Sequence, residues 1–348
     1  MPTIKKQAKR IYTETALKIR TLKTQKSTVK NLKRIAKNKA TNRTLSRVTK
    51  SKKPADYTNT SYIFIRANEE DNGTRPVQGI SCLSPDLNVI PADADPGALE
   101  ETQIEPGRQY HIECIIRNLG DLDLPMVAVD FFLVTPALGF NVTAAKALGI
   151  TSTTINGQGS SRVTFDWIAG SEDSGHRCLF ARAYSHSPSD LPDDYDAFDA
   201  RNDRHIAQQN LTVLNEGDTL DFDVYPAERG QKGGAFQIII RPVNKLPDKL
   251  IIHPAIKKLA MKTSRVTPKF NVVEKPNFLK GGASLTLRKK TNQVGWSGNL
   301  KKATVARFTL VAPPLRLRRR EAKAFELIKI DTKTRKEAGS IMIIVRGK

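Results

Sequence analysis

The sequence predicts an all-β protein in which two β-sandwiches follow each other along the chain. Apolar side chains alternate with others, at a period of two, in Pro125–Val134 and again in Arg162–Ile168. Such alternation is typical of a strand that is buried on one face. Turn residues such as Pro106, Gly107 and Asn118 recur between short apolar runs, which favours a sandwich or a barrel. The predicted inward-facing residues are Val127, Val129, Phe131 and Leu133 in the first strand and Val163, Phe165 and Trp167 in the second.

The charge is divided into three blocks along the 348 residues, whose formal net charge is +22. Residues 1–54 hold 18 Lys and Arg against one acid, residues 55–216 hold 10 against 24, and residues 217–348 hold 29 against 10. A basic tail and a basic domain therefore bracket an acidic one. This asymmetry indicates either an anionic partner or docking of basic on acidic parts, within one molecule or between copies.

Domain boundaries follow these changes in composition, and the length suits roughly two to three domains. We predict a basic tail, partly helical or disordered, at 1–54, a linker with a short extra strand at 55–83, an acidic sandwich at 84–216 and a basic sandwich at 217–348. No apolar run approaches the roughly 20 residues of a membrane helix, and the N-terminus lacks the apolar core of a signal peptide. The expected location is the cytoplasm, with non-classical export or association with a particle left open.

The basic tail has apolar residues near helical spacing, but cations one turn apart repel each other and weaken such a helix. One interpretation is an arm that binds phosphates and releases their counterions. The alternatives are an arm that docks on the acidic sandwich of its own or a neighbouring chain, and a disordered or targeting tail; charge alone does not decide between them. The candidate anion-binding residues of the tail are Lys5, Lys6, Lys9, Arg10, Lys33, Arg34, Lys37 and Lys39.

The acidic sandwich is expected to begin near Pro85, and a short strand in Ser61–Ala67 precedes it as an edge strand of a neighbouring sheet. Its later strands are predicted at Tyr110–Ile116, Pro125–Val134, Arg162–Ile168, Arg177–Tyr184 and Leu211–Leu214. They carry the runs GRQYHIECIIRNLGD, VAVDFFLV, RVTFDWIAG, GHRCLFARAYS and DARNDRHIAQQNLTVL. Together with the preceding SPDL, these runs resemble a bacterial cell-adhesion-related immunoglobulin-like domain (CARDB type) over about residues 84–215.

The resemblance implies a fold rather than a reaction. Domains of that family are non-catalytic binding or spacer modules, often on surface proteins. An immunoglobulin-like fold also places Cys114 and Cys178 where such domains carry a disulfide between their sheets. In a cytosolic protein, buried thiols are the expected state instead. The candidate disulfide Cys114–Cys178 and two free thiols are therefore alternatives.

The loop Asp190–Asp203 is rich in aspartate, and hard oxygen ligands in a flexible loop are suited to Ca²⁺. The EF-hand pattern fails, because the loop has no Gly at the sixth position and no closing Glu at the twelfth. The alternatives are a solvated hairpin loop and an acidic landing site for a basic surface. The weak calcium candidates are Asp193, Asp194, Asp196 and Asp199; no other metal site and no cofactor is predicted.

The basic C-terminal domain is predicted to be a second immunoglobulin-like sandwich. Its strands are expected at Gly217–Tyr225, Ala235–Pro242, Leu250–Ile252, Ala283–Leu287, Ala306–Val311, Ala322–Ile330 and Ile341–Val345. A cluster of four arginines, Arg316, Arg318, Arg319 and Arg320, follows the fifth of these strands. With Lys257, Lys258 and Lys262, among other lysines of this domain, it forms an anion-binding face if the charges converge, and a solvated basic surface if they do not.

Motifs for catalysis are missing from the sequence. None of the five histidines lies in a zinc-binding pattern, the glycine pairs match no phosphate-binding fingerprint, and no G-x-S-x-G elbow occurs. The main hypothesis is a non-catalytic structural or binding protein. Its sandwiches mediate contacts with another protein or with copies of itself, and the basic tail acts as a docking arm. The alternative is a polyanion-binding, for example nucleic-acid-binding, protein that uses the tail and the C-terminal domain. An enzyme with a site assembled across loops is the third and weakest hypothesis.

Overall fold

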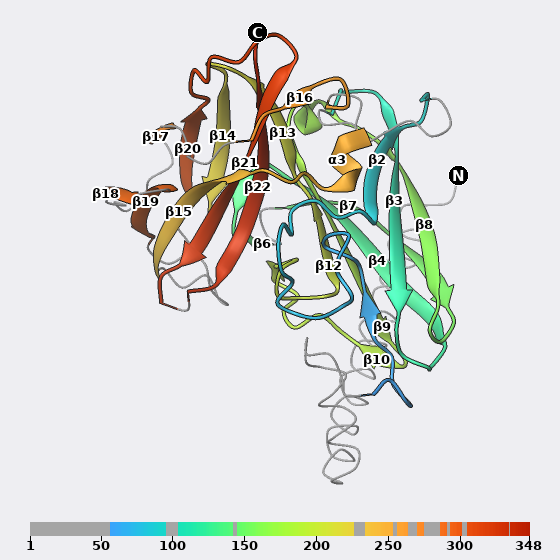
Figure 1. The fold of residues 1–348 in the computed structure, drawn as a ribbon. Helices are drawn as coiled ribbons and strands as arrows, with labels where there is room; N and C mark the ends of the chain where they lie inside the picture. Colours follow the sequence, from blue (N-terminus) through green and yellow to red (C-terminus); the bar gives the residue numbers. More distant parts are fainter. Residues whose placement is uncertain are drawn as a thin grey trace, which may run out of the picture. The chain divides into compact units, whose positions relative to one another are not determined.

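The protein is nearly all β in a computed structural model, as the alternation of apolar residues predicted (Figure 1). All described residues belong to one compact unit, Lys50–Lys348. In this part of the chain, no helix has the length and apolar character needed to cross a membrane. The structure describes residues 56–94, 104–141, 145–225, 234–252, 256–263, 270–274, 286–290, 293–300, 305–333 and 335–348.

The first sandwich has one sheet centred on β3 (Gln109–Asn118). β2 (Leu87–Pro91) and the short β1 (Ile63–Phe64) pair with one edge of β3, and β8 (Ser160–Ile168) pairs with the other edge. All three pairings are antiparallel. β1 confirms the edge strand that the sequence predicted in Ser61–Ala67.

The facing sheet has the strand order β10, β9, β4 and β7, and β12 also pairs with β9. The bounds of these strands are Leu124–Val134 for β4, Lys146–Ile155 for β7, Cys178–His186 for β9, Ser189–Asp190 for β10 and Ile206–Gln209 for β12. The pairings are again antiparallel. β7 and β8 follow each other in the chain but belong to opposite sheets, so the turn between them crosses the sandwich.

The first core lies between these two sheets and confirms the predicted alternation. Its central side chains, each with an exposed fraction of 0%, are Tyr110, Ile112, Cys114, Ile116, Val127, Val129 and Phe131. Gly149 in β7 makes room for Phe165, because a Cβ atom at position 149 would lie only 2.4 Å from the Phe165 ring. That ring stacks on Phe131, with 5.6 Å between the ring centroids.

β4 departs from simple alternation near its end, because both of its faces are buried there. Phe132 points away from the first core into a second cluster that contains Phe180 and Phe198. Phe198 belongs to β11 (Ala197–Phe198), which pairs with β6 (Phe140–Asn141). The acidic loop, for which a solvated hairpin was one of the expected alternatives, therefore folds back onto the sheet and supplies part of a core.

The second sandwich combines a seven-stranded and a four-stranded sheet. The larger sheet has the order β13, β22, β21, β15, β19 and β18, with β16 beside β21, and the smaller has the order β17, β20, β14 and β5. The bounds are Ala137–Leu138 (β5), Leu211–Asn215 (β13), Thr219–Val224 (β14), Gly234–Val243 (β15), Ala260–Met261 (β16), Asn271–Glu274 (β17), Thr286–Lys290 (β18), Gln293–Leu300 (β19), Ala306–Val311 (β20), Glu321–Asp331 (β21) and Glu337–Arg346 (β22). A core with Phe222, Phe308 and Phe325 takes residues from both sheets.

Two predicted strands are wrong in place or type. Leu211–Leu214 was expected to close the first sandwich, but as β13 it pairs in parallel with β22 of the second. β12 already completes the first sandwich by pairing with β9. Leu250–Ile252 is not a strand but the end of the short helix α3 (Asp248–Ile252). Proline fits the start of a helix and an acid fits its first turn, and here Pro247 and Asp248 supply both.

The described parts of residues 56–216, called the first half, and of residues 217–348, called the second half, contribute strands to common sheets and side chains to a common core. β5 from the first half pairs in parallel with β14, and a third core extends from Cys82 to Ile344. The segment 55–83 was predicted as a linker with a short extra strand; its described part, residues 56–83, is packed, and Tyr62, Ile63 and Ile65 are each at most 1% exposed. The division into two domains at residue 216 stays a prediction.

Candidate functional site

Charged residues of the first half are engaged mainly with one another. Nitrogen–oxygen distances in these pairs are 2.7 Å for Arg66–Asp86, 2.8 Å for Arg75–Asp71, 3.0 Å for Arg108–Asp93, 3.2 Å for Arg162–Glu113, 2.6 Å for Arg182–Asp130 and 2.5 Å for Arg204–Asp190. The carboxylates of Asp71, Asp86 and Asp190 are fully buried. Removing the arginine from one of these three carboxylates would leave a buried charge without compensation, so breaking such a pair would destabilise the fold.

Arg204 and its partners form a network of several buried contacts. Its guanidinium is fully buried, pairs with Asp190, donates to the backbone carbonyl of Ile63 and lies 4.0 Å from the centroid of the Tyr62 ring. Asp190 in turn accepts a hydrogen bond of 2.6 Å from the Ile63 backbone N–H. Arg204 and Asp190 therefore fasten β1 to the end of the acidic loop.

His205 extends this network with its two ring nitrogens. Nδ1 lies 2.7 Å from the Asp203 carboxylate and Nε2 lies 3.0 Å from that of Asp190. Burial and the nearby Arg204 lower the pKa of His205, but the two carboxylates outweigh them and the pKa is raised above its ordinary value. Because both nitrogens face acceptors, the doubly protonated imidazolium fits this position.

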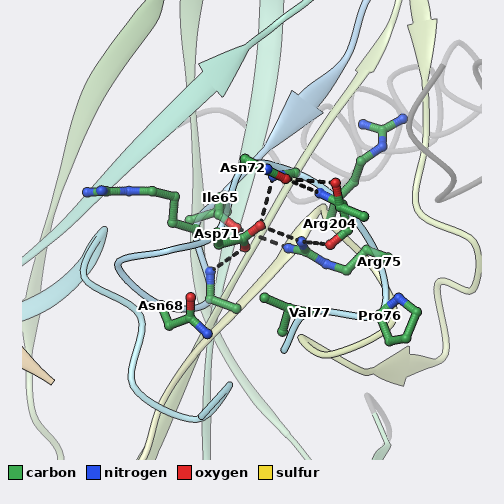
Figure 2. Close-up of polar contacts among 12 residues, drawn as sticks. Ile65, Asn68, Asp71, Asn72, Arg75, Pro76, Val77 and Arg204 are labelled. Carbon is green, nitrogen blue, oxygen red and sulfur yellow. Dashed lines mark hydrogen bonds and ion pairs between the residues drawn. The ribbon is translucent and has the colours of Figure 1, made fainter. Parts of the chain in front are cut away.

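Asp71 and Arg75 fasten the packed segment that contains β1, as Figure 2 shows. The Asp71 carboxylate accepts hydrogen bonds of 2.8 Å from the backbone N–H groups of Ala67 and Gly73 and from Arg75. The Asn68 amide donates to the backbone carbonyls of Gln78 (2.7 Å) and Ile80 (2.9 Å). These bonds satisfy the backbone of a segment that lacks long strands, which explains why it can be buried.

A further group of charges joins the two halves. Arg201 lies 2.5 Å from the Glu337 carboxylate in β22. It also donates to the carbonyls of Val77 (3.0 Å) and Gly79 (2.8 Å). Arg241 in β15 lies 3.7 Å from the same Glu337. Residues from three distant parts of the sequence thus meet at Arg201 and Glu337.

Lys329 in β21 is fully buried beside the pairing of β5 with β14. Its ammonium donates to the backbone carbonyl of Tyr225. A Cβ atom at Gly139 would lie 2.7 Å from the Lys329 Nζ atom, so only glycine leaves room there for the amine. Burial lowers the pKa of Lys329 to about 7, and Asp331 opposes that shift. A nucleophilic amine of this kind would need access to a substrate, and this one is enclosed.

The predicted arginine cluster is solvent-exposed. Arg316, Arg318, Arg319 and Arg320 are all exposed, and none forms an ion pair with a carboxylate in the described parts of the chain. Arg316 and Arg320 have positive backbone φ angles of 54° and 72°. The eight predicted anion-binding residues of the tail, Lys5, Lys6, Lys9, Arg10, Lys33, Arg34, Lys37 and Lys39, lie outside the described residues.

Two other site predictions are not supported by the geometry. The calcium candidates Asp193, Asp194, Asp196 and Asp199 do not gather into a metal-binding group, and no such group occurs among the described residues. Asp194 and Asp199 accept bonds from backbone N–H groups of their own loop instead. Cys114 and Cys178 are free thiols, because Cys114 faces the first core and Cys178 faces the second cluster on the other side of the sheet.

The sequence did not reveal the buried ion pairs. Asp203, Arg204 and His205 are adjacent in the chain, which was the available signal, but Asp190, the partner of both Arg204 and His205, lies 14 and 15 positions before them in β10. Lys329 was also missed, although a lysine between two isoleucines in an apolar strand is itself unusual. The fold and these contacts define a class of protein: an all-β module in which many described charged residues of the first half form internal ion pairs.

Comparisons with known proteins do not assign this chain to a family. No protein-family model matches the chain, and no curated protein matches it in sequence. Among solved structures, a GH3 β-glucosidase from Bifidobacterium adolescentis matches with 12% identity and a TM-score of 0.19, over 35% of this chain and 16% of that one.

Two other bacterial structures match over more of the chain. The CupB6 tip adhesin from Pseudomonas aeruginosa has 9% identity and a TM-score of 0.17, over 75% of this chain and 97% of that one. The C-terminal domain of the antigen I/II-family protein AspA from Streptococcus pyogenes has 8% identity and a TM-score of 0.20, over 74% and 99%. Scores this low carry no argument about function, and the CARDB-type resemblance stays a prediction.

Proposed function

We propose that this protein is a non-catalytic structural or binding protein whose β-sandwiches mediate contacts in an assembly. The basic tail serves as a docking arm on an acidic surface of a partner protein or of another copy. The cytoplasm is the proposed location, and association with a particle is compatible with this role.

The observation that carries the proposal is the use of the charged side chains. Arg204, Asp190 and His205 are buried and bond to each other and to the backbone of β1. The partly buried pair Arg201–Glu337 links the two halves in a similar way, and Arg201 also donates to the carbonyls of Val77 and Gly79. Groups enclosed in this way stabilise a rigid body and do not face a substrate. Such rigidity suits a module that presents surfaces to partners.

Sedimentation velocity of the full chain at low and high salt tests the proposal. We expect concentration-dependent association at low salt that disappears at high salt, because exposed charges are screened. The variant Lys5→Gln/Lys6→Gln/Lys9→Gln/Arg10→Gln should associate less at low salt. As a control, Lys333→Gln/Arg335→Gln, at an exposed turn, should behave like the wild type. A monomer at every concentration and salt would contradict docking on another copy, and if in addition no partner protein were recovered, it would contradict the docking arm altogether.

A second candidate function is polyanion binding, and one observation favours it. The arginines of the first half are mostly paired with carboxylates, whereas Arg316, Arg318, Arg319 and Arg320 are exposed and lack such partners in the described residues. Exposed arginines are suited to phosphate groups, which they bind with two parallel hydrogen bonds.

A further inference from the structure

We propose that one end of the second sandwich, the basic end, is the surface on which the phosphate backbone of a duplex nucleic acid docks. This inference rests on the second candidate function and names its surface and its partner. The basic end consists of Lys257, Lys258, Lys262, Arg316, Arg318, Arg319, Arg320, Arg346 and Lys348.

Strand pairing brings three separate basic segments to this end. β16 pairs in parallel with the start of β21, and the Ala260 backbone N–H donates to the Arg320 carbonyl at 2.7 Å. The arginine segment also pairs with the C-terminal residues, because Arg319 forms a parallel bridge with Gly347. Figure 1 shows β16 and the C-terminus at the same end of the second sandwich. The sequence did not show whether these basic segments lie together, and the strand pairing places all three at one end of the sandwich.

Tight packing holds the C-terminal strand against the arginine segment. A Cβ atom at Gly347 would lie 2.4 Å from the backbone oxygen of Arg318 and 2.6 Å from that of Leu317. Gly347 also donates its backbone N–H to the Glu321 carbonyl at 2.9 Å. The exposed cations Arg346 and Lys348, on either side of Gly347, are therefore fixed next to Arg318 and Arg319.

The carboxylates near this end are already engaged with other groups. Glu216 accepts hydrogen bonds of 2.9 Å from the backbone N–H groups of Leu315 and Leu317. Glu321 accepts one of 3.0 Å from the Arg318 backbone N–H and lies 3.1 Å from the Lys262 ammonium. These acids order the backbone of the arginine segment but form no ion pair with its guanidinium groups, so the positive charge of the segment faces solvent.

Nucleic acid suits this surface better than a protein partner. Stable protein interfaces need an apolar or aromatic centre, but four of the described large apolar residues that are exposed, Met126, Ile150, Ile168 and Tyr195, belong to the first sandwich and its loops, and the fifth, Ile251 in α3, is the only one of them close in sequence to residues 257–262. A surface made only of cations gains affinity by releasing counterions from phosphates. It has no aromatic side chain for stacking on single-stranded bases, which favours a duplex.

The test compares two full-length variants of equal net charge. Arg318→Gln/Arg319→Gln/Arg320→Gln removes three cations from the basic end. Lys333→Gln/Arg335→Gln/Lys336→Gln removes three from the turn at the far end of β21, whose 11 residues span roughly 33 Å. Binding of a short labelled DNA duplex is measured by fluorescence anisotropy across a salt series, and thermal unfolding shows that both variants remain folded.

We expect the basic-end variant to bind the duplex at least roughly tenfold more weakly. The slope of the logarithm of its binding constant against the logarithm of the salt concentration should be smaller in magnitude by about two to three, because each phosphate contact contributes about 0.9 to that slope. The turn variant should stay close to the wild type. Equal losses in both variants would overturn the basic end as the site. No binding by the wild type would overturn the second candidate function itself. Displacement of the DNA by polyglutamate at equal charge would instead assign the surface to an acidic protein.

Discussion

Lys329 and His205 are both buried titratable side chains, but their surroundings shift their pKa values in opposite directions. Burial dominates at Lys329, whose main contact is a neutral carbonyl, and lowers its pKa to about 7. At His205, Asp203 and Asp190 outweigh burial and raise the pKa. The two residues should therefore give opposite contributions to stability as the pH rises.

Lys329→Met should stabilise the protein, by roughly 2 to 4 kcal/mol at about pH 6. The pKa of Lys329 is about 7 in the fold against an ordinary value of 10.5. Between these values the unfolded chain binds more protons, so the wild type gains stability as the pH rises, and below about 7 the penalty is complete. Urea unfolding at about pH 6 and pH 10 should show a smaller difference at the higher pH. A variant less stable than the wild type at pH 6 would contradict this.

His205→Gln should destabilise the protein by roughly 2 to 3 kcal/mol at about pH 6 and by less at about pH 9. A raised folded pKa contributes stability that is complete below the unfolded value of about 6.5 and is lost as the pH rises through the folded value. His111→Gln is the matched control, because the partly exposed His111 has only Asp166 beside it, at 2.6 Å. The same loss at both pH values would show that His205 is not charged.

Local patterns predicted which residues are buried but not which charges pair. The inward residues of β3, β4 and β8 follow from their period of two. The Ile63 backbone and Asp190 are 127 positions apart, and no pattern in one segment shows that the other will lie beside it. The same limit hid the fact that Cys114 and Cys178 face different cores.

Length alone did not decide which elements could be predicted, because the two-residue β1 was expected and the ten-residue β7 was not. β3, β4 and β8 carry enough alternating residues to define a face, whereas β5, β6, β10 and β11 have two residues each. Such short strands exist because neighbouring segments offer them a pairing edge. β13 has a clear strand sequence, yet its partner β22 lies at the other end of the chain, so its sheet was assigned wrongly.

Gly149→Ala should destabilise the first sandwich by roughly 1 to 3 kcal/mol, because overpacking a core forces side chains out of their preferred positions. The new Cβ would lie 2.4 Å from the Phe165 ring. Adding Phe165→Leu in the same chain should recover part of the loss, since the smaller side chain leaves space for the methyl group. Thermal unfolding of the wild type, of Gly149→Ala and of the double variant measures both effects. If the double variant is no more stable than Gly149→Ala, the contact is not the cause.

The whole described molecule is held together by contacts between its halves. Strand pairing joins β5 to β14 and β13 to β22, and the Arg201–Glu337 pair adds an ion pair. The arginine cluster could be predicted from the sequence as four neighbouring cations. Its meeting with residues 257–262 and with the C-terminal residues could not, because it depends on the pairing of β16 with β21.

We expect the two halves to unfold in one cooperative transition. Trp167 lies in β8 of the first half and Trp296 in β19 of the second, and the chain has two tryptophans, so each half carries one fluorescent reporter. The variants Trp167→Phe and Trp296→Phe therefore follow one half each during urea unfolding. Coinciding midpoints, after correction for each variant's stability, are the expected result. Separate midpoints would show two independently folding domains.

The pairing of β13 with β22 has a consequence for biosynthesis. β22 lies inside the larger sheet, between β13 and β21, and it leaves the ribosome after every other strand described here. Asn215 and Arg346, which meet at one end of this pairing, are 131 positions apart. During translation the edge of β13 that pairs with β22 must therefore wait for the last described strand, and an unpaired apolar strand is prone to aggregate in that period.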